Sequence, residues 1–470
     1  MVIVFVLVGL AVLAAFGALH WYAWRRLVRD TTSGPGLARR SGTVLFVAGP
    51  LLMFGAIASE RAGAPFRLQQ VLAWPGFLWM ALSLYLLLAL LVGEVLRPLA
   101  RWGLTRRSAA AGQSSAAEDG AAVAGTPAAV VTGARDVTVG SAPGRGASEG
   151  AGAEPGARAT GLADAPSTDG PGDGPTPAAE PGAAGGSAPD TAGATGPSRR
   201  LFVSRVVGGA AAAAAVGTVG YGTYGVLRGP AVKRVTVPLA KLPRSAHGFR
   251  IAVVSDIHLG PVLGRGFAQK VVDTINSTQP DLIAVVGDLV DGSVKDLGPA
   301  SAPLAGLRAR HGAFFVTGNH EYFSGAEQWV RQVRELGIHP LENARTELAG
   351  FDLAGVNDVQ GESEGQGPDF GRALGDRDTS RACVLLAHQP VQIHEAVRHG
   401  VDLQLSGHTH GGQLWPGNLV ADAANPTLAG LERYGDTQLY VSRGAGAWGP
   451  PTRVGAPSDI TVVELASRQA

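Results

Sequence analysis

Two histidines separated by one residue stand out in the stretch SGHTHGGQ, residues 406–413. The chain holds 11 histidines among 470 residues, so composition alone does not place two of them so close together. Alternate residues of an extended strand point to the same side, and His408 and His410 could therefore reach one target together. A polar turn after a strand would give the same pattern, so this stretch by itself leaves a metal site and a turn open.

Four more polar clusters follow short apolar runs earlier in the same half of the chain. They supply carboxylate, imidazole and amide groups from the segments SDIH, GDLVD, GNHE and AHQP: Asp256, His258, Asp288, Asp291, Asn319, His320 and His388. This donor set, which contains no thiolate, suits divalent Mn, Fe or Zn. One ion needs only about four protein ligands, so the larger set favours two ions that share a bridging carboxylate. Asp at a strand end is often a helix cap, but five unrelated caps would have to coincide.

The elements that position these clusters read as an α/β domain over residues 232–470. Short apolar runs such as FRIAVVSD, DLIAVVGD, AFFVTGN, ACVLLAH and VDLQLSG predict buried strands, and GFAQKVVDTINS and AEQWVRQVRELG between them predict helices. This alternation indicates a buried sheet flanked by helices. Ligands of such sheets bind beyond the carboxyl ends of the strands, where the polar clusters fall.

In order along the chain, these clusters resemble the five motifs of the calcineurin-like metallophosphoesterases. The matching motifs are Asp256-x-His258, Gly287-Asp288-x-x-Asp291, Gly318-Asn319-His320-Glu321, His388 and Gly407-His408-x-His410. The segments GNHEYFSG, GHTHGGQLWP and SRGAGAWGPPTR are similar to the membrane-anchored bacterial members of that superfamily. The resemblance covers about residues 245–465 and implies an αββα sandwich, in which two packed sheets are flanked by helices.

The resemblance also implies roles for the matching residues. Asp256, His258 and His410 would bind the first metal; Asn319, His388 and His408 would bind the second; and Asp288 would bridge them. Two such metals would turn a water into a hydroxide that attacks phosphorus in line. His320 would protonate the leaving oxygen or donate to the transition state.

Three residues keep two interpretations each. Asp291 could orient His320 or a metal ligand, or could cap a helix or turn after GDLV. Arg443 and Arg453 could meet a substrate phosphate, or could be ordinary loop arginines. The glycines Gly411 and Gly412 are expected to let the backbone pass close to the site.

The first 107 residues predict a membrane region. Apolar runs at about 2–22, 43–59 and 71–96 are each close to the roughly 20 residues that a helix needs to cross a bilayer. The first run lacks the basic start of a signal peptide and is read as an anchor. Residues 108–197 are rich in Ala, Gly and Pro and poor in large apolar residues, which predicts a disordered linker.

Residues 198–231 begin with SRRLF and continue as an apolar run long enough for a fourth span. SRRLF resembles a twin-arginine export signal, and an ordinary positive flank of a membrane anchor fits it equally well. Arginines are more numerous after the first and third runs than after the second, which predicts a multi-pass protein of the cell membrane. The N-terminus and the C-terminal domain would then lie outside the cytoplasm, although Arg228, Lys233 and Arg234 argue weakly against this.

The amino-acid composition argues against nucleic-acid binding and against cysteine-based sites. A net charge of +1 without a basic domain gives no support to nucleic-acid binding. The one cysteine, Cys383, excludes a disulfide within the chain and a thiolate zinc site.

The leading hypothesis is therefore a metal-dependent phosphoesterase that acts on a membrane or cell-envelope phosphoester, such as a lipid-linked one. The alternatives are a tethered nucleotide or cyclic-nucleotide phosphodiesterase and a metal-binding membrane sensor without turnover.

Overall fold

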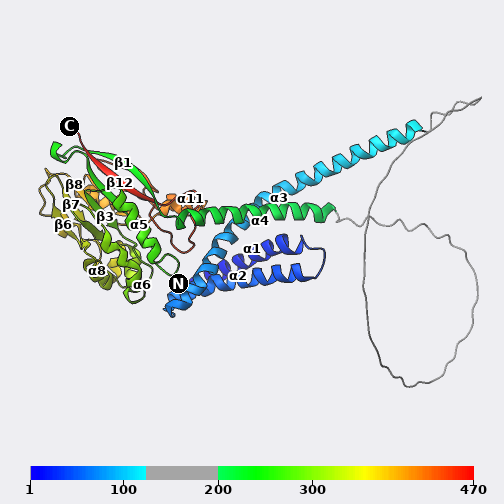
Figure 1. The fold of residues 1–470 in the computed structure, drawn as a ribbon, viewed down its shortest axis with the longest axis horizontal. Helices are drawn as coiled ribbons and strands as arrows, with labels where there is room; N and C mark the ends of the chain where they lie inside the picture. The colour runs from blue at the N-terminus through cyan, green and yellow to red at the C-terminus, as the bar shows by residue number, and fades with distance from the viewer. Residues whose placement is uncertain (1, 123–198, 470) are drawn as a thin grey trace, which may run out of the picture. The chain divides into compact units, whose positions relative to one another are not determined.

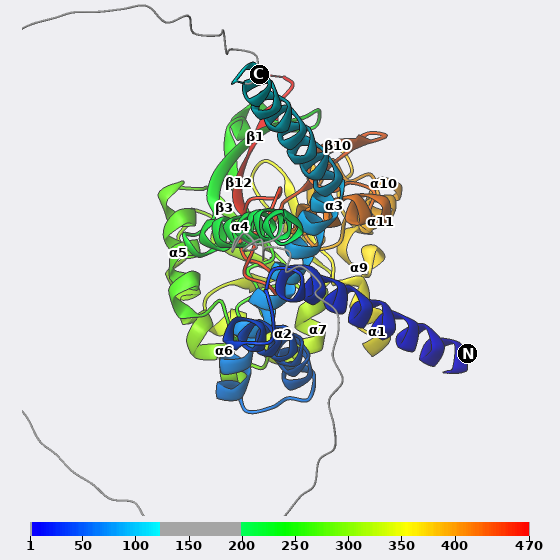
Figure 2. The ribbon, with the colours of Figure 1, turned by 90° about the vertical axis from the view of Figure 1, so that its right-hand side faces the viewer.

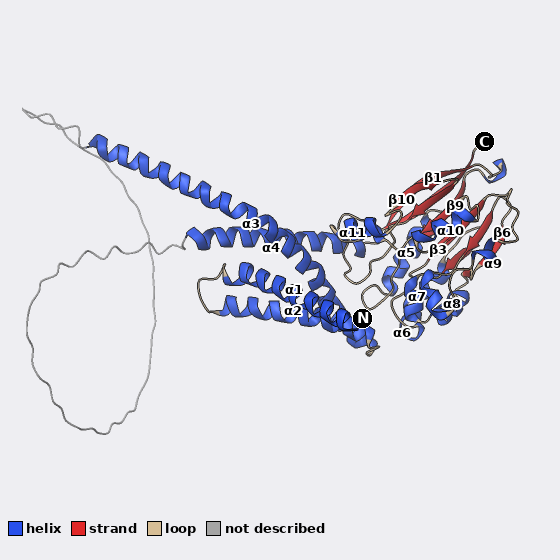
Figure 3. Cartoon of the chain, turned by 180° about the vertical axis from the view of Figure 1, so that it is seen from behind, coloured by secondary structure: helices blue, strands red, loops and turns tan. Residues whose placement is uncertain are grey.

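The computed structural model describes residues 2–122 and 199–469. It divides into two units, which are described separately: Met1–Thr105 with Pro197–Ala470, and Arg106–Gly196. The first unit contains the apolar helices and the α/β domain, and all strands of the described chain lie in that domain (Figure 3).

Within residues 2–122 and 199–469, four helices are long and apolar enough to cross a membrane, as the apolar runs predict. They are α1 (Val2–Trp24), α2 (Leu37–Arg61), α3 (Phe66–Ala122) and α4 (Arg199–Leu227), and a π-helical turn at Arg25–Arg29 follows α1. Helix α3 runs well past the expected end of the third span. Residues 108–122 of the expected linker are therefore helical, because their many alanines favour a helix. The rest of that linker lies outside the described residues.

The first sheet has six strands in the order β1-β12-β2-β3-β4-β5. These strands are β1 (Ala231–Leu239), β12 (Asp459–Ser467), β2 (Phe249–Val254), β3 (Leu282–Val286), β4 (Ala313–Val316) and β5 (His339–Pro340). Strands β2 to β5 are parallel, and β12 runs antiparallel to β2 but parallel to β1. Sequence reasoning found β2, β3 and β4, whereas the pairing of β1 with β12 joins segments from opposite ends of the domain.

The second sheet has the order β10-β11-β9-β8-β7-β6. Its strands are β6 (Ala344–Glu347), β7 (Asp352–Gly355), β8 (Cys383–Leu386), β9 (Leu403–Ser406), β10 (Gly430–Tyr434) and β11 (Thr437–Val441). Strands β7, β8, β9 and β11 are parallel, and the edge strands β6 and β10 are antiparallel to their neighbours.

The two sheets pack face to face, and helices cover their outer faces. In β2, Ile251 and Val253 join the core between the sheets, whereas Ala252 and Val254 face the outer helices. Helices α5 (Arg265–Ser277), α6 (Val294–Ser301) and α8 (Ala326–Glu335) cover the first sheet, and α9 (Phe370–Leu374) and α10 (Ile393–Arg398) cover the second. Helices α5 and α6 lie on the opposite side of the domain from α9 and α10 (Figure 2), and α8 lies beside α6 (Figure 1). The αββα sandwich is confirmed.

The carboxyl ends of the parallel strands lead into the polar clusters. Strands β2, β3 and β4 end at Val254, Val286 and Val316, just before SDIH, GDLVD and GNHE. Strands β8 and β9 end at Leu386 and Ser406, just before AHQP and GHTH. Two short helices complete this edge: α7 (Asn319–Ser324) and α11 (Gly417–Ala424).

Candidate metal centre

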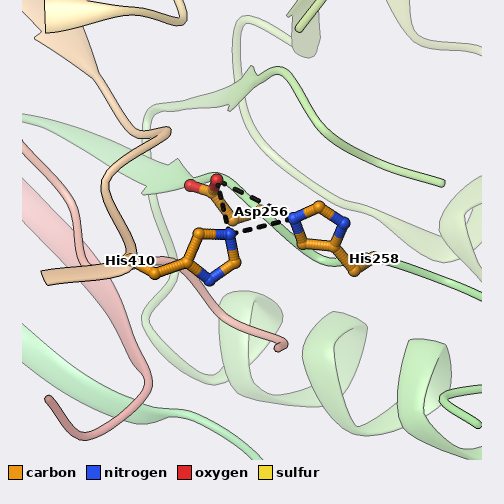
Figure 4. Close-up of side chains that lie close together, drawn as sticks. All are labelled: Asp256, His258 and His410. Atoms are coloured by element: carbon orange, nitrogen blue, oxygen red, sulfur yellow. Dashed lines mark hydrogen bonds and ion pairs between the residues drawn. The ribbon is translucent and has the colours of Figure 1, made fainter. Parts of the chain in front are cut away.

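Three of the predicted ligands form one buried cluster. His258 Nε2 lies 3.0 Å from His410 Nε2, which in turn lies 3.3 Å from Asp256 Oδ1 (Figure 4). His258 Nε2 also lies 4.0 Å from that same carboxylate oxygen. All three side chains are buried and offer ligand atoms within 4.8 Å of one another, so they could hold one metal ion.

A second cluster lies beside the first. His388 Nε2 lies 3.1 Å from Asp288 Oδ2, and His408 Nδ1 lies 3.0 Å from Asn319 Oδ1. The ligand atoms of Asp288, His388 and His408 again lie within 4.8 Å of one another. Asp288 Oδ2 is also 3.7 Å from His258 Nε2 of the first cluster. The structure thus brings all seven predicted ligands together, with Asp288 between the two groups.

The backbone is strained where it carries these side chains. Asp256, His258, Asp288, His408 and His410 all have left-handed backbone conformations, with φ between 49° and 71°. Such conformations cost a non-glycine residue on the order of 1–3 kcal/mol and collect at functional sites. Periodicity does not reveal this strain, because it depends on how the loops close above the strands.

Two motif glycines are required because the loops approach each other very closely. A Cβ atom at Gly318 would lie 2.2 Å from Asp288 Oδ1, and one at Gly407 would lie 2.4 Å from Asp256 Oδ2. Any side chain at either position would push a predicted metal ligand out of place. These glycines therefore belong to the site as much as the ligands that they flank.

The protonation states suit a cation. Burial lowers the pKa of both His408 and His410 to about 4, so both rings are neutral near pH 7. Burial alone would disfavour charged Asp256 and Asp288, but the facing histidines hold the pKa of each carboxyl well below its ordinary value. Neutral imidazoles and ionised carboxylates are the forms that bind metals.

His388 gives a direct test of whether a metal fits. Its Nδ1 lies 2.9 Å from the carbonyl oxygen of Val286 and donates to it, which leaves Nε2 as an acceptor in the neutral ring. That Nε2 is buried without a hydrogen-bond partner and faces the Asp288 carboxylate. Burial opposes a charged ring, but the Asp288 and Asp256 carboxylates outweigh it and raise the pKa of His388 well above its ordinary value. The carboxylates thus favour a positive charge at Nε2, and a metal ion that replaced the proton there would supply it, so the residues fit a metal ion.

Asp291 links the metal ligands to His320. Its Oδ1 lies 2.9 Å from His258 Nδ1 and 2.7 Å from His320 Nδ1. Burial disfavours a charged His320, but the hydrogen bond and the charge of Asp291 outweigh it and raise the pKa of His320 to about 9. Of the two interpretations of Asp291, this geometry favours orientation of histidines over a cap.

Glu321 is a site residue to which sequence reasoning gave no role. Its fully buried carboxylate accepts hydrogen bonds from the backbone N–H groups of Asp288 at 2.9 Å, Leu289 at 2.7 Å and Gly318 at 2.7 Å. It therefore holds the loop after β3 against the loop after β4. The signal was present in GNHE, but only the fold shows which N–H groups the carboxylate meets.

The structure also bears on the two interpretations of Arg453 and on the expectation for Gly412. Arg453 is buried and donates to the carbonyl oxygens of Gly446, His410 and Ala456, so it braces the ligand loop instead of facing a phosphate. Gly412 lies against α11, since a Cβ atom there would lie 2.2 Å from the Cα atom of Asn418.

Comparison with known proteins agrees with this geometry. A sequence model described as calcineurin-like phosphoesterase matches residues 249–412. An uncharacterized metallophosphoesterase of Aquifex aeolicus is 35% identical over 239 residues, which cover 50% of this chain and 91% of the relative. An uncharacterized metallophosphoesterase of Bacillus subtilis is 30% identical over 284 residues, which cover 57% of this chain and 98% of the relative.

The chain belongs to the calcineurin-like phosphoesterases. Another relative, from Danio rerio, is a transmembrane protein with metallophosphoesterase domain, 38% identical over 259 residues. The match covers 52% of this chain and 59% of that protein, and the next relative, from Helicobacter pylori, is covered over 66% of its length. The chain thus spans about six tenths of the length of these relatives. Calcineurin-like phosphoesterases use divalent metals, and the buried His/Asp clusters supply groups that could bind them.

Proposed function

We propose that this protein hydrolyses phosphoesters at a dinuclear metal centre. The observation that carries the proposal is the position of Asp288, 3.1 Å from His388 of one cluster and 3.7 Å from His258 of the other. Asp256, His258 and His410 would hold one ion, and Asn319, His388 and His408 the other, with Asp288 shared. Two divalent ions bound there would supply an activated water and offset charge on the phosphoryl oxygens. The ions are expected to be Mn, Fe or Zn.

His320 would complete the reaction as the general acid. The water oxygen bonds to phosphorus as the bond from phosphorus to the leaving oxygen breaks, and His320 gives its proton to that leaving oxygen. Asp291 holds His320 and favours its protonated form, which is the form needed for this transfer. The leaving alcohol and the phosphorylated fragment then depart as products.

Hydrolysis of bis-p-nitrophenyl phosphate by the purified full chain tests this function. Metal-free protein would receive Mn, Zn or no metal, and released p-nitrophenol and bound metal would both be measured. We expect turnover only with metal and two ions per chain at saturation. A folded, metal-loaded chain that hydrolyses neither this diester nor the monoester would favour the sensor hypothesis instead.

We also propose that the substrate is reached from outside the cytoplasm. At one end of the helices, Arg26 and Arg97 pair with Glu94, and Arg205 donates to the carbonyl oxygen of Thr31. At the other end, Thr223 of α4 contacts Thr452 of the domain. The arginine-rich end would face the cytoplasm. Single added cysteines at Arg29 and Arg433, tested with a membrane-impermeant maleimide in intact cells, should label only at position 433.

A further inference from the structure

An unusual band of exposed apolar side chains lies on the domain. It comprises five residues from three segments, here called the apolar rim: Phe323, Trp415, Leu419, Val420 and Trp448. Trp415 is 50% exposed, Trp448 is 56% exposed and Val420 is 73% exposed. Helix α11, which carries Leu419 and Val420, has no buried residue at all. Exposed apolar groups gathered in this way mark a surface that meets another apolar phase.

One end of the rim touches the catalytic machinery. The ring of Trp448 lies 5.5 Å from that of His320, and the ring of Phe323 lies 5.6 Å from it on α7. The side chain of Gln413 holds the Trp448 loop, because it donates to the Trp448 carbonyl at 2.9 Å and accepts from the Trp448 N–H at 3.0 Å. Any group that contacts the rim here is also close to the proposed general acid.

The other end of the rim touches the apolar helices. The Tyr85 hydroxyl of α3 donates to the Trp415 carbonyl at 2.9 Å. Leu414 and Val454 pack into one cluster with Ala81 and Tyr85 of α3 and with neighbouring residues of α4, namely Ala215 and Val219. Tyr85 and Val219 both lie within candidate membrane spans, not beyond their ends. The segment that leads into α11 is therefore packed on the parts of α3 and α4 that would lie in a bilayer.

The membrane helices also border the metal site itself. A small cavity beside His258 and Asp291 is lined by Glu60, the penultimate residue of α2, and by Phe77 of α3. Trp448 of the rim lines the same cavity. The candidate metal centre, helices α2 and α3 and the rim thus each contribute to the lining of one cavity.

We propose that α11 and the apolar rim insert into the bilayer leaflet next to the domain, and that the site takes a phosphoester carried by a membrane lipid. The claim about the substrate rests on the proposed function. The claim that α11 and the rim insert does not depend on that function. The occupant is lipid because the rim continues the surface of helices that are themselves long and apolar enough to span. Leu419, Val420 and Trp415 would enter the acyl boundary, as in other interfacial helices. The phosphorus would then lie at headgroup depth beside His320.

Spin labelling of the full chain in phosphatidylcholine nanodiscs tests the insertion. The native Cys383 is fully buried, so a nitroxide can be directed to Val420→Cys on α11. Val216→Cys on α4 gives the lipid reference, and Val397→Cys on α10 gives the water reference; both native side chains are exposed. We expect the label at 420 to collide with oxygen more than with a water-soluble nickel chelate, as at 216. A label at 420 that behaves like the label at 397 would overturn the proposal.

Paired substrates test the link to catalysis. Hexadecyl p-nitrophenyl phosphate in nanodiscs and methyl p-nitrophenyl phosphate in solution share the same scissile bond. The double variant L419N/V420N should lose at least about tenfold in kcat/KM on the hexadecyl ester and stay within about twofold on the methyl ester. The matched control V391N/V397N alters two exposed valines, one in the turn Pro390–Gln392 and one on α10, and should change neither. Equal losses on both esters would contradict lipid delivery, whereas wild-type protein inactive on both would defeat the proposed function alone.

Discussion

Soluble domains usually bury apolar side chains and expose polar ones, and both the centre of the site and the apolar rim depart from this distribution. At the centre, Asp256, Asp288, His258 and His388 are polar and almost fully buried. At the rim, Phe323, Trp448 and Val420 are apolar and exposed. Both arrangements disfavour the isolated folded chain, because buried charges lose their hydration and exposed apolar side chains stay in unfavourable contact with water. The proposed partners, cations for the centre and lipid for the rim, would each remove one of these costs.

Among changes at the centre and the rim, Asp288→Asn should reduce activity most, because it removes the carboxylate shared by the two clusters. We expect kcat/KM on bis-p-nitrophenyl phosphate to fall by at least about 10³-fold, with loss of one bound metal. Elemental analysis of the purified variant would give the metal content. Asp378→Asn, at an exposed surface carboxylate, serves as the control. Near-normal turnover with one metal would show that the two clusters do not act as a pair.

His320→Ala should come next, with both metals retained. Loss of a general acid costs about 10²–10⁴-fold in rate. The loss should be greater on a phenyl phosphodiester than on its p-nitrophenyl counterpart, because the poorer leaving oxygen depends more on protonation. Steady-state rates on the two esters measure this difference. Equal losses on the two would assign His320 to transition-state binding rather than to proton donation.

Glu321→Gln tests how the centre is held in place. The neutral amide keeps the shape, but its NH2 group cannot accept, so at least one of the three hydrogen bonds from the Asp288, Leu289 and Gly318 N–H groups is lost. We expect unfolding to become easier by about 1–3 kcal/mol. Thermal melting of the metal-loaded chain would show this, and activity should fall less than in Asp288→Asn. An unchanged melting temperature would mean that the loops do not depend on this carboxylate.

Asp291→Asn should act mainly through pH. His320 must be protonated to donate, so activity falls as pH rises through its pKa, which Asp291 helps raise to about 9. Without that carboxylate, the falling limb of the kcat/KM profile should move to lower pH, toward the ordinary histidine value near 6.5. A profile recorded from pH 6 to pH 10 would measure the shift. The same limb position in both proteins would assign the titration to another group.

Trp448→Ala should have the smallest effect, and only on lipid-borne substrate. The side chain is 56% exposed, so its removal should leave the melting temperature nearly unchanged. The hexadecyl ester should be hydrolysed a few-fold more slowly, and the methyl ester at the wild-type rate. A comparable loss on the methyl ester would place Trp448 in contact with the reacting phosphate group instead.

The sequence predicts the centre far better than the rim. Strand runs that end in Asp, His or Asn predict both the element and the polar end, since strand direction fixes where those residues gather. The role of Glu321 depends on which N–H groups the fold brings to it. The extension of α3 to Ala122 was not predicted, because residues 108–122 share the low-complexity composition of the linker although their alanines favour a helix. The rim joins Trp415 and Trp448 from separate loops, and no periodicity connects them.

The position of β12 has a consequence for how the chain matures. Among the strands of the described residues β12 is the last along the chain, yet it lies between β1 and β2, one strand in from the edge of the first sheet. Strand β1, which directly follows α4, can therefore pair with β12 only after almost the whole domain has been synthesised. Until Asp459–Ser467 has been synthesised, β1 cannot join the other strands of the first sheet. Pairings between segments so far apart in the sequence form slowly. The first sheet therefore reaches its full strand order only after Asp459–Ser467 has been made.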